Sequence, residues 1–181
     1  MLISVIVTCR NRLHHLRQSL PRMLAQTGAE TVVVDYGCQQ GTRDWVRSLA
    51  HPAARCVGVD DDPQFCLSRA RNLGAAQARG TWLLFVDADI LIDGDLGARL
   101  AANARPGQFC TAGQPRKPST AGSVACERSA FDRVGGYDEA MRGWAWEDFD
   151  FYSRLRSAGL IEAHFPPRFL DPIAHGNEER Q

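Results

Sequence analysis

The stretch TWLLFVDADIL, residues Thr81 to Leu91, contains an apolar run that ends on two carboxylates, Asp87 and Asp89. Side chains alternate faces along a strand, so Asp87 and Asp89 point the same way if the strand continues. If the strand stops, both lie at its carboxyl end. Asp at a strand end also has an ordinary structural role, because it turns the chain and caps a following helix. A D-x-D motif alone therefore leaves the function open, and the surrounding sequence must decide.

Three similar apolar runs precede this one. All four are short, rich in Val, Leu or Ile, and bounded by polar residues, which is typical of buried strands. The predicted strands are residues 3–8 (ISVIVT), 31–35 (TVVVD), 55–59 (RCVGV) and 82–87 (WLLFVD).

Helical patterns lie between these runs. Leucines recur at three- and four-residue spacing from 13 to 24, where Pro21 predicts a kink. A short helix is expected at 45–49 and another at 67–80, ended by Gly80. Strands that alternate with helices predict an α/β fold with a mainly parallel central sheet flanked by helices.

The polar stretches TCRNR, DYG and DAD each follow a predicted strand. Ligands of such sheets bind at the carboxyl ends of the strands. The position of Asp87 and Asp89 therefore favours a functional role over a capping role.

The second half of the chain has a different character. Residues 104–121 are rich in Pro, Gly and polar residues and predict a long loop after a nucleotide-binding half at 1–103. Residues 122–176 then predict a strand, a short helix, and a helix after WEDFD that Gly159 ends. The polar tail beyond His175 is expected to fray.

Composition limits the class of protein. The 181 residues suit one domain, and 21 basic residues balance 21 acidic ones, which argues against nucleic acid as a partner. No signal peptide or membrane-spanning run is present, so a cytoplasmic protein is expected, with peripheral membrane association left open. Six cysteines without a C-x-x-C pair predict free, buried thiols.

Several other chemistries lack their motifs. A calcium loop starting at Asp87 would need Gly and Glu where Ile92 and Ala98 stand. The chain contains no G-x-G-x-x-G after the first strand, no G-K-[ST] and no G-x-S-x-G. These absences argue against dinucleotide binding, a P-loop and a Ser-His-Asp hydrolase.

Five motifs follow one another in the order known from one group of enzymes. They are TCRNRLHHL (8–16), SRARN (68–72), DAD (87–89), GSVA (122–125) and GWAWEDFDFYSRL (143–155). In this order the chain resembles GT-A glycosyltransferases, most closely the Golgi β-galactosyltransferases and bacterial family-2 enzymes such as chondroitin-type polymerases. The resemblance implies one GT-A (Rossmann-like) catalytic domain over residues 1–181.

The same resemblance implies a hexosyltransferase of polysaccharide biosynthesis. It would move a sugar from a nucleotide donor, expected to be a UDP-sugar, to a hydroxyl of a glycan or lipid-linked acceptor, with inversion. A divalent cation, Mn²⁺ or Mg²⁺, suits this chemistry because it neutralises the leaving diphosphate. By resemblance Asp89 and His175 would bind the metal, and Asp87 would contact ribose or a metal-bound water.

The resemblance also assigns the nucleotide and acceptor sites. Arg10, Arg69 and Asp35 would hold the nucleotide, whereas Arg71 and Asn72 are weaker candidates. In the acidic turn Asp148 would be the base, and Glu147 and Asp150 would hold acceptor hydroxyls. Trp144 would stack on the acceptor or move with a closing loop. Acids in the first turn of a helix also interact favourably with its dipole, which is the structural alternative for this group.

Three positions depart from the resembled pattern: Tyr36 replaces an acid, Cys38 replaces Ser, and Trp146 stands where glycine is expected. These departures keep a second hypothesis open, a non-catalytic nucleotide-sugar-binding or assembly protein that retains the fold. A nucleotidyltransferase is a further alternative. It would need a Gly-rich basic loop after the first strand, and CRNRLHHL contains no glycine.

Overall fold

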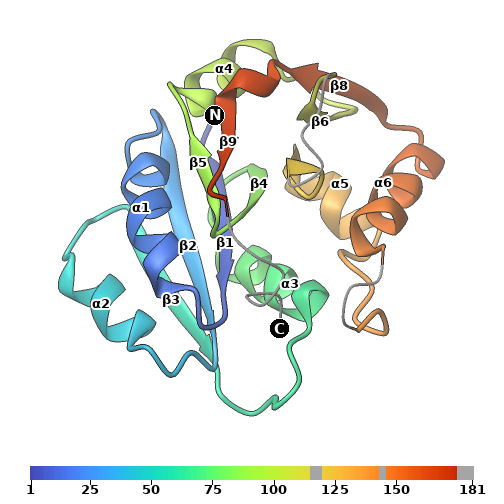
Figure 1. Cartoon of the computed structure of the whole chain (residues 1–181). Coiled ribbons are helices and arrows are strands. Elements are labelled where there is room, and N and C mark those ends of the chain that lie inside the picture. Colours follow the sequence, from blue (N-terminus) through green and yellow to red (C-terminus); the bar gives the residue numbers. More distant parts are fainter. Residues whose placement is uncertain (115–119, 143–145, 175–181) are drawn as a thin grey trace.

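A seven-stranded sheet with the strand order β3-β2-β1-β4-β7-β6-β8 runs through the domain (Figure 1). The computed structural model describes residues 1–114, 120–142 and 146–174. The strands of the large sheet are β1 (Ile3–Cys9), β2 (Ala29–Tyr36), β3 (Ala54–Val59), β4 (Trp82–Asp87), β6 (Gln108–Ala112), β7 (Val124–Glu127) and β8 (Ile161–Phe165). The four predicted strands are confirmed as β1 to β4.

Parallel pairing joins β3, β2, β1 and β4, whereas β7 pairs antiparallel with both β4 and β6. Two short strands, β5 (Ile90–Ile92) and β9 (Leu170–Pro172), form a second, antiparallel sheet. A short 3₁₀ helix, η2 (Pro167–Phe169), leads into β9. The single α/β domain with a mostly parallel sheet is the predicted fold class.

Helices cover both faces of the large sheet, which explains why its strands are apolar almost throughout. The helices are α1 (Leu13–Leu24), α2 (Thr42–Ser48), α3 (Leu67–Gln77), α4 (Leu96–Asn103), α5 (Arg128–Arg133) and α6 (Glu147–Ser157). Along β1, Val5 and Val7 pack with α1 and α4, whereas Ile6 packs with α3 and α6. Figure 1 shows α1 and α2 on one side of the sheet and α3, α5 and α6 on the other.

Two expectations about the elements are wrong. Helix α3 ends at Gln77, and Gly80 is required for another reason: a Cβ there would lie 2.6 Å from the backbone N of Ser4. The expected long loop at 104–121 contains β6, because Phe109 and Cys110 bury their side chains against the sheet. The expected end of the last helix is confirmed, since α6 stops just before Gly159, which has φ +85°.

All six cysteines are free thiols, and four of them are buried as expected of small apolar side chains. Cys38 and Cys56 are half-buried. Among the described residues, none of the helices has the length and apolar character needed to span a membrane.

Candidate active site

The carboxyl ends of β1, β2 and β4 lie side by side. Cys9 at the end of β1 is aligned with Asp35 of β2, and Thr8 is aligned with Asp87 of β4. The turns after these strands therefore bring TCRNR, DYG and DAD to one edge of the sheet, as predicted.

Arg71 lies beside the end of β4, where it contacts Asp87. It projects from the buried side of α3, and only 2% of its side chain is exposed. Its Nη1 donates to Asp148 Oδ1 at 2.5 Å and lies 3.9 Å from Glu147 Oε1, while its Nη2 donates to Asp87 Oδ1 at 3.2 Å. One guanidinium thus connects the D-x-D motif after β4 to the first turn of α6.

Burial opposes a positive charge on Arg71, but the carboxylates of Asp148 and Asp87 outweigh it and raise the pKa of Arg71. One third of the Asp87 side chain reaches solvent. Desolvation raises the pKa of Asp87 to about 6 against the opposing effect of Arg71, and the charges of Asp89 and Asp148 add to the rise. The carboxylates at this edge therefore repel one another, and a cation is favoured here.

Gly122 and Tyr137 enclose the same cluster. A Cβ at Gly122 would lie 2.8 Å from Arg71 Nη2 and 2.9 Å from Asp148 Oδ2, so a side chain here would displace one of them. The Arg71 guanidinium lies 4.9 Å from the centre of the Tyr137 ring. Among the described residues the buried Tyr137 hydroxyl finds no hydrogen-bond partner. Gly122 of the GSVA motif therefore leaves room for the side chains of Arg71 and Asp148, which a larger residue would displace.

Asp89 has a different cationic partner. Arg12, the last residue before α1, donates from Nη1 to Asp89 Oδ2 at 3.1 Å. The backbone N–H of Ile173 donates to the carbonyl of Asp89 at 2.7 Å, so the segment after β9 returns to the D-x-D turn. His175 and Trp144, two of the predicted site residues, lie outside the described residues.

The donor set at this edge fits a divalent cation that arrives with a ligand. Four carboxylates face two guanidinium groups: Asp87, Asp89, Glu147 and Asp148 against Arg12 and Arg71. No group of three or more His, Cys, Asp or Glu side chains forms a complete metal site within the described parts of the chain. A magnesium-type cation commonly uses only one or two carboxylates and takes its other ligands from water and substrate phosphates.

Arg10 and Asp35 lie at the β3 side of the edge. The Arg10 guanidinium lies 6.0 Å from the ring centres of Tyr36 and Phe65 and donates to the carbonyl of Pro63. Asp35 is buried and accepts the backbone N–H of Cys38 at 2.9 Å. The DYGC turn thus keeps its first acid at the strand end although it departs from the resembled sequence.

The contacts of Tyr36 explain why a tyrosine stands where the resembled pattern has an acid. Its ring is buried, and its hydroxyl donates to Asp62 Oδ2 at 2.6 Å. Burial raises the pKa of Tyr36 to about 12, and the Asp62 carboxylate adds to this. Tyr36 is therefore a packing residue that fixes the loop after β3.

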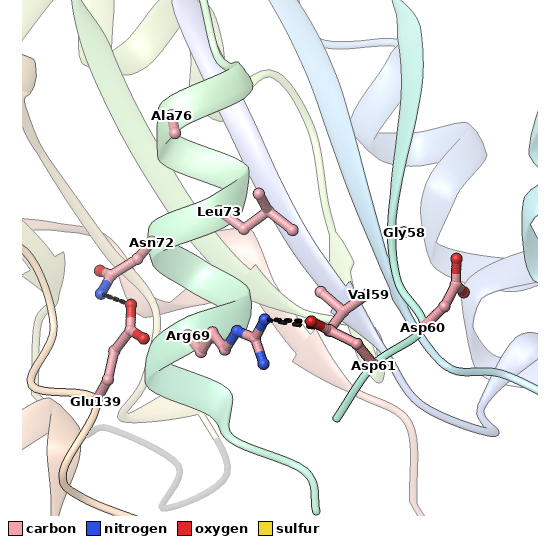
Figure 2. Close-up of a pocket in the computed structure, with 9 residues that line it drawn as sticks. All are labelled: Gly58, Val59, Asp60, Asp61, Arg69, Asn72, Leu73, Ala76 and Glu139. Atoms are coloured by element: carbon pink, nitrogen blue, oxygen red, sulfur yellow. Dashed lines mark hydrogen bonds and ion pairs between the residues drawn. The ribbon is translucent and has the colours of Figure 1, made fainter. Parts of the chain in front are cut away.

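The structure does not bring Arg69 to the D-x-D turn. It lies on a different face of α3 from Arg71 and pairs with Asp61 and Asp62 at 3.1 and 3.0 Å. Figure 2 shows Arg69 directed toward Asp61 at the rim of a hollow of about 660 Å³ between α3 and the end of β3. Asp60, Asp61 and Glu139 line this hollow, and their negative charge disfavours a diphosphate there.

The remaining predicted acids separate into two groups. Glu147 lies with Asp148 beside Arg71, whereas Asp150 is held by Arg154 one turn along α6, at 2.6 Å. Trp146 and Phe149 expose their rings 5.2 Å apart at the start of this helix. An aromatic surface therefore borders the acidic pair.

Sequence reasoning underrated Arg71 and did not single out Arg12 or Tyr137. A signal for Arg71 existed, because Ala70, Gly74 and Ala75 mark the buried side of α3 and Arg71 lies among them. No comparable pattern marks Arg12, whose role depends on a contact 77 residues away.

Comparison with known proteins gives the family of this chain. Residues 4–157 match the model of glycosyl transferase family 2, so the chain belongs to that family. Validoxylamine A glucosyltransferase of Streptomyces hygroscopicus subsp. jinggangensis is 26% identical over 220 residues, which cover 88% of this chain and 52% of that enzyme. Glycosyltransferase AglE of Haloferax volcanii is 31% identical over 91 residues, 48% of this chain and 30% of that protein.

Solved structures show the same fold. TarS 1-349 of S. aureus, in complex with UDP-GlcNAc, has a TM-score of 0.81 at 17% identity, covering 97% of this chain and 59% of that one. Mannosyltransferase PcManGT from Pyrobaculum calidifontis, in complex with GDP-Man and Mn²⁺, has a TM-score of 0.73 at 21% identity, covering 91% and 54%. This chain therefore spans between half and three fifths of the glucosyltransferase, TarS 1-349 and PcManGT, and about a third of AglE.

Proposed function

We propose that this chain is the catalytic domain of a metal-dependent hexosyltransferase that uses a nucleotide sugar. The observation that carries the proposal is the position of Arg71, which holds Asp87 of the D-x-D turn and Asp148 of α6 in one cluster. Asp87, which is proposed to act on the donor, and Asp148, which is proposed to act on the acceptor, then lie at the same reaction centre.

Asp89 would hold the divalent cation, which when bound would neutralise charge on the leaving diphosphate, and Asp87 would contact ribose or a metal-bound water. His175 is proposed as a third ligand by resemblance. The hydrogen bond from Ile173 to Asp89 supports this proposal, because it fixes the chain beside Asp89 two residues earlier.

Asp148 is proposed as the base that accepts the proton of the attacking hydroxyl, a role that needs a carboxylate held within hydrogen-bond reach of the acceptor. Its Oδ2 lies close to Gly122, where no side chain blocks the approach. A single base opposite the leaving group supports in-line displacement and inversion. Glu147 is proposed to hold an acceptor hydroxyl beside it.

Arg10 and Asp35 are proposed to hold the nucleotide. Asp35 offers a carboxylate at the end of β2, and the planar Arg10 guanidinium can stack on a base. We propose a UDP-sugar as the donor and a glycan or lipid-linked hydroxyl as the acceptor. TarS in complex with UDP-GlcNAc supports the nucleotide choice, whereas PcManGT in complex with GDP-Man makes GDP the alternative to test.

The finer resemblance to galactosyltransferases and chondroitin-type polymerases rests on the order of the five motifs, with the acidic turn in GWAWEDFDFYSRL as its C-terminal part. The second candidate function is a non-catalytic nucleotide-sugar-binding protein. Its support is the shorter matched region: the alignment with the validoxylamine A glucosyltransferase extends over 220 residues, more than this chain contains, so that enzyme carries insertions within it.

Calorimetric titration of UDP and of GDP, each with Mn²⁺ and with chelator, tests the donor site. We expect manganese-dependent binding of UDP by the wild type, and loss of that binding in Asp89→Ala. Asp132→Asn, which changes an exposed acid of α5, is the matched control and should bind like the wild type.

The two nucleotides separate the outcomes. Tighter binding of GDP than of UDP would change the donor class but keep the site. Nucleotide binding that is equally tight with and without Mn²⁺, and unchanged in Asp89→Ala, would contradict the proposed metal site.

A further inference from the structure

Arg12 and Asp89 form an ion pair at the edge of the proposed metal site. Arg12 comes from the turn after β1 and Asp89 from the turn after β4, and Nη1 lies 3.1 Å from Oδ2. The two side chains are 19% and 12% exposed, so salt screens this pair less than one on the surface.

This pair competes with the proposed function of Asp89. A cation bound directly to Asp89 needs carboxylate oxygens, and Arg12 already donates to one of them. The guanidinium and a divalent cation also repel each other across a few ångströms. A metal that arrives alone must therefore displace Arg12.

The backbone of Arg12 makes contacts of its own, separate from the ion pair of its side chain. The start of α1 is held by backbone bonds, from the N–H groups of His15 and Leu16 to the carbonyl of Arg12. The side chain of Arg12 makes no capping hydrogen bond. Its release from Asp89 leaves these backbone bonds intact.

A diphosphate provides the displaced guanidinium with a new partner. Arginine pairs with phosphate as readily as with carboxylate, because its planar donors match both groups. The metal then binds Asp89 while the diphosphate pairs with Arg12. Each ligand therefore breaks the Arg12–Asp89 ion pair that opposes binding of the other.

We propose that Arg12 is a positioning residue that couples metal binding to diphosphate binding by occupying Asp89 until the donor arrives. This inference rests on the proposed function. Coupling of this kind is reciprocal, so UDP raises the affinity for Mn²⁺ by the same factor as Mn²⁺ raises the affinity for UDP.

The test is a thermodynamic cycle of Mn²⁺ and UDP titrations on the wild type, Arg12→Gln, Arg12→Lys and a control. Arg17→Gln serves as the control, because it removes one charge from an exposed position of α1. Thermal melts of all four proteins check folding.

We expect Arg12→Gln to bind Mn²⁺ alone roughly tenfold more tightly, within the range of typical coupling energies. UDP should then tighten Mn²⁺ binding by a correspondingly smaller factor than in the wild type. Arg12→Lys keeps the charge and should restore part of the coupling, and Arg17→Gln should match the wild type.

An unchanged or weaker affinity of Arg12→Gln for Mn²⁺ alone would overturn the inference. So would a UDP-induced gain equal to that of the wild type. Failure of every variant to bind UDP would contradict the proposed function instead. In that case a Mn²⁺ gain seen only in Arg12→Gln would still support competition for Asp89.

Discussion

Gly122 is the residue on which the spacing of the acidic cluster depends most closely. A Cβ there would approach Arg71 Nη2, Asp148 Oδ2 and, at 3.3 Å, Asp87 Oδ2. These atoms are ends of side chains, but their mutual ion pairs restrict where they can go. The backbone of Gly122 adopts no positive φ, so an alanine would act through crowding alone.

We expect Gly122→Ala to lower turnover by roughly ten- to a hundredfold, since small displacements of catalytic groups cost that much. Gly113→Ala is the matched control, because a Cβ there meets His164 at an ordinary 3.5 Å. Nucleotide release assays on both variants check the prediction. Equal activities would show that the cluster tolerates crowding.

The choice between Arg69 and Arg71 shows where sequence reasoning stops at this scale. The two arginines are two positions apart on α3, about 200° around the helix, so only one can face the sheet. The SRARN motif contains both arginines. The small residues Ala70 and Gly74 mark the buried side of α3, and Arg71 lies on that side. Burial on a helix face was the stronger signal.

At the scale of elements, α6 carries the acidic pair and its end is fixed by Gly159. This glycine has φ +85°, and nothing lies within 4 Å of a Cβ built on it. A substitution there tests backbone conformation without crowding any neighbour.

We expect Gly159→Ala to destabilise the protein by about 1–2 kcal/mol, the cost of a left-handed conformation for a residue with a Cβ. Urea denaturation measures the change. Binding of UDP should persist, because Gly159 lies more than two turns from Asp148. A stability equal to the wild type would mean that the chain after α6 relaxes at no cost.

Strands were predictable where burial on both faces of the sheet produced continuous apolar runs, as in β1, β2 and β4, and β3 was predictable from its short apolar sequence although it is only half-buried. Strand β6 could not be predicted, because Pro, Gly and polar residues on both sides of QFCTA make the whole segment resemble a loop. Strands β5 and β9 could not be predicted either, because their three-residue lengths are too short to show a period. Their pairing depends on contacts between distant segments.

At the scale of the whole molecule, Arg71 joins the two halves of the chain. It projects from α3, and its carboxylate partners come from β4 and from α6. Removal of a buried cation leaves its partners uncompensated, which costs more than the pair itself contributes.

We expect Arg71→Met to lower the free energy of unfolding by about 3 kcal/mol, near the lower end for a broken buried pair because its partners are partly exposed. Arg71→Lys should lower the free energy of unfolding by less, because it keeps the positive charge. Arg47→Met, at an exposed position of α2, should change stability by less than about 0.5 kcal/mol. Urea denaturation of the three variants decides. A stable Arg71→Met would show that the cluster does not hold the halves together.

The most direct test of the account is turnover by Asp148→Asn. Release of nucleoside diphosphate from UDP-glucose, UDP-GlcNAc, UDP-galactose and GDP-mannose is measured with Mn²⁺ for the wild type, Asp148→Asn and Asp132→Asn. We expect Asp148→Asn to bind UDP like the wild type but to turn over roughly 10²- to 10⁴-fold more slowly on whichever donor the wild type uses. Turnover within a few-fold of the wild type would contradict Asp148 as the base.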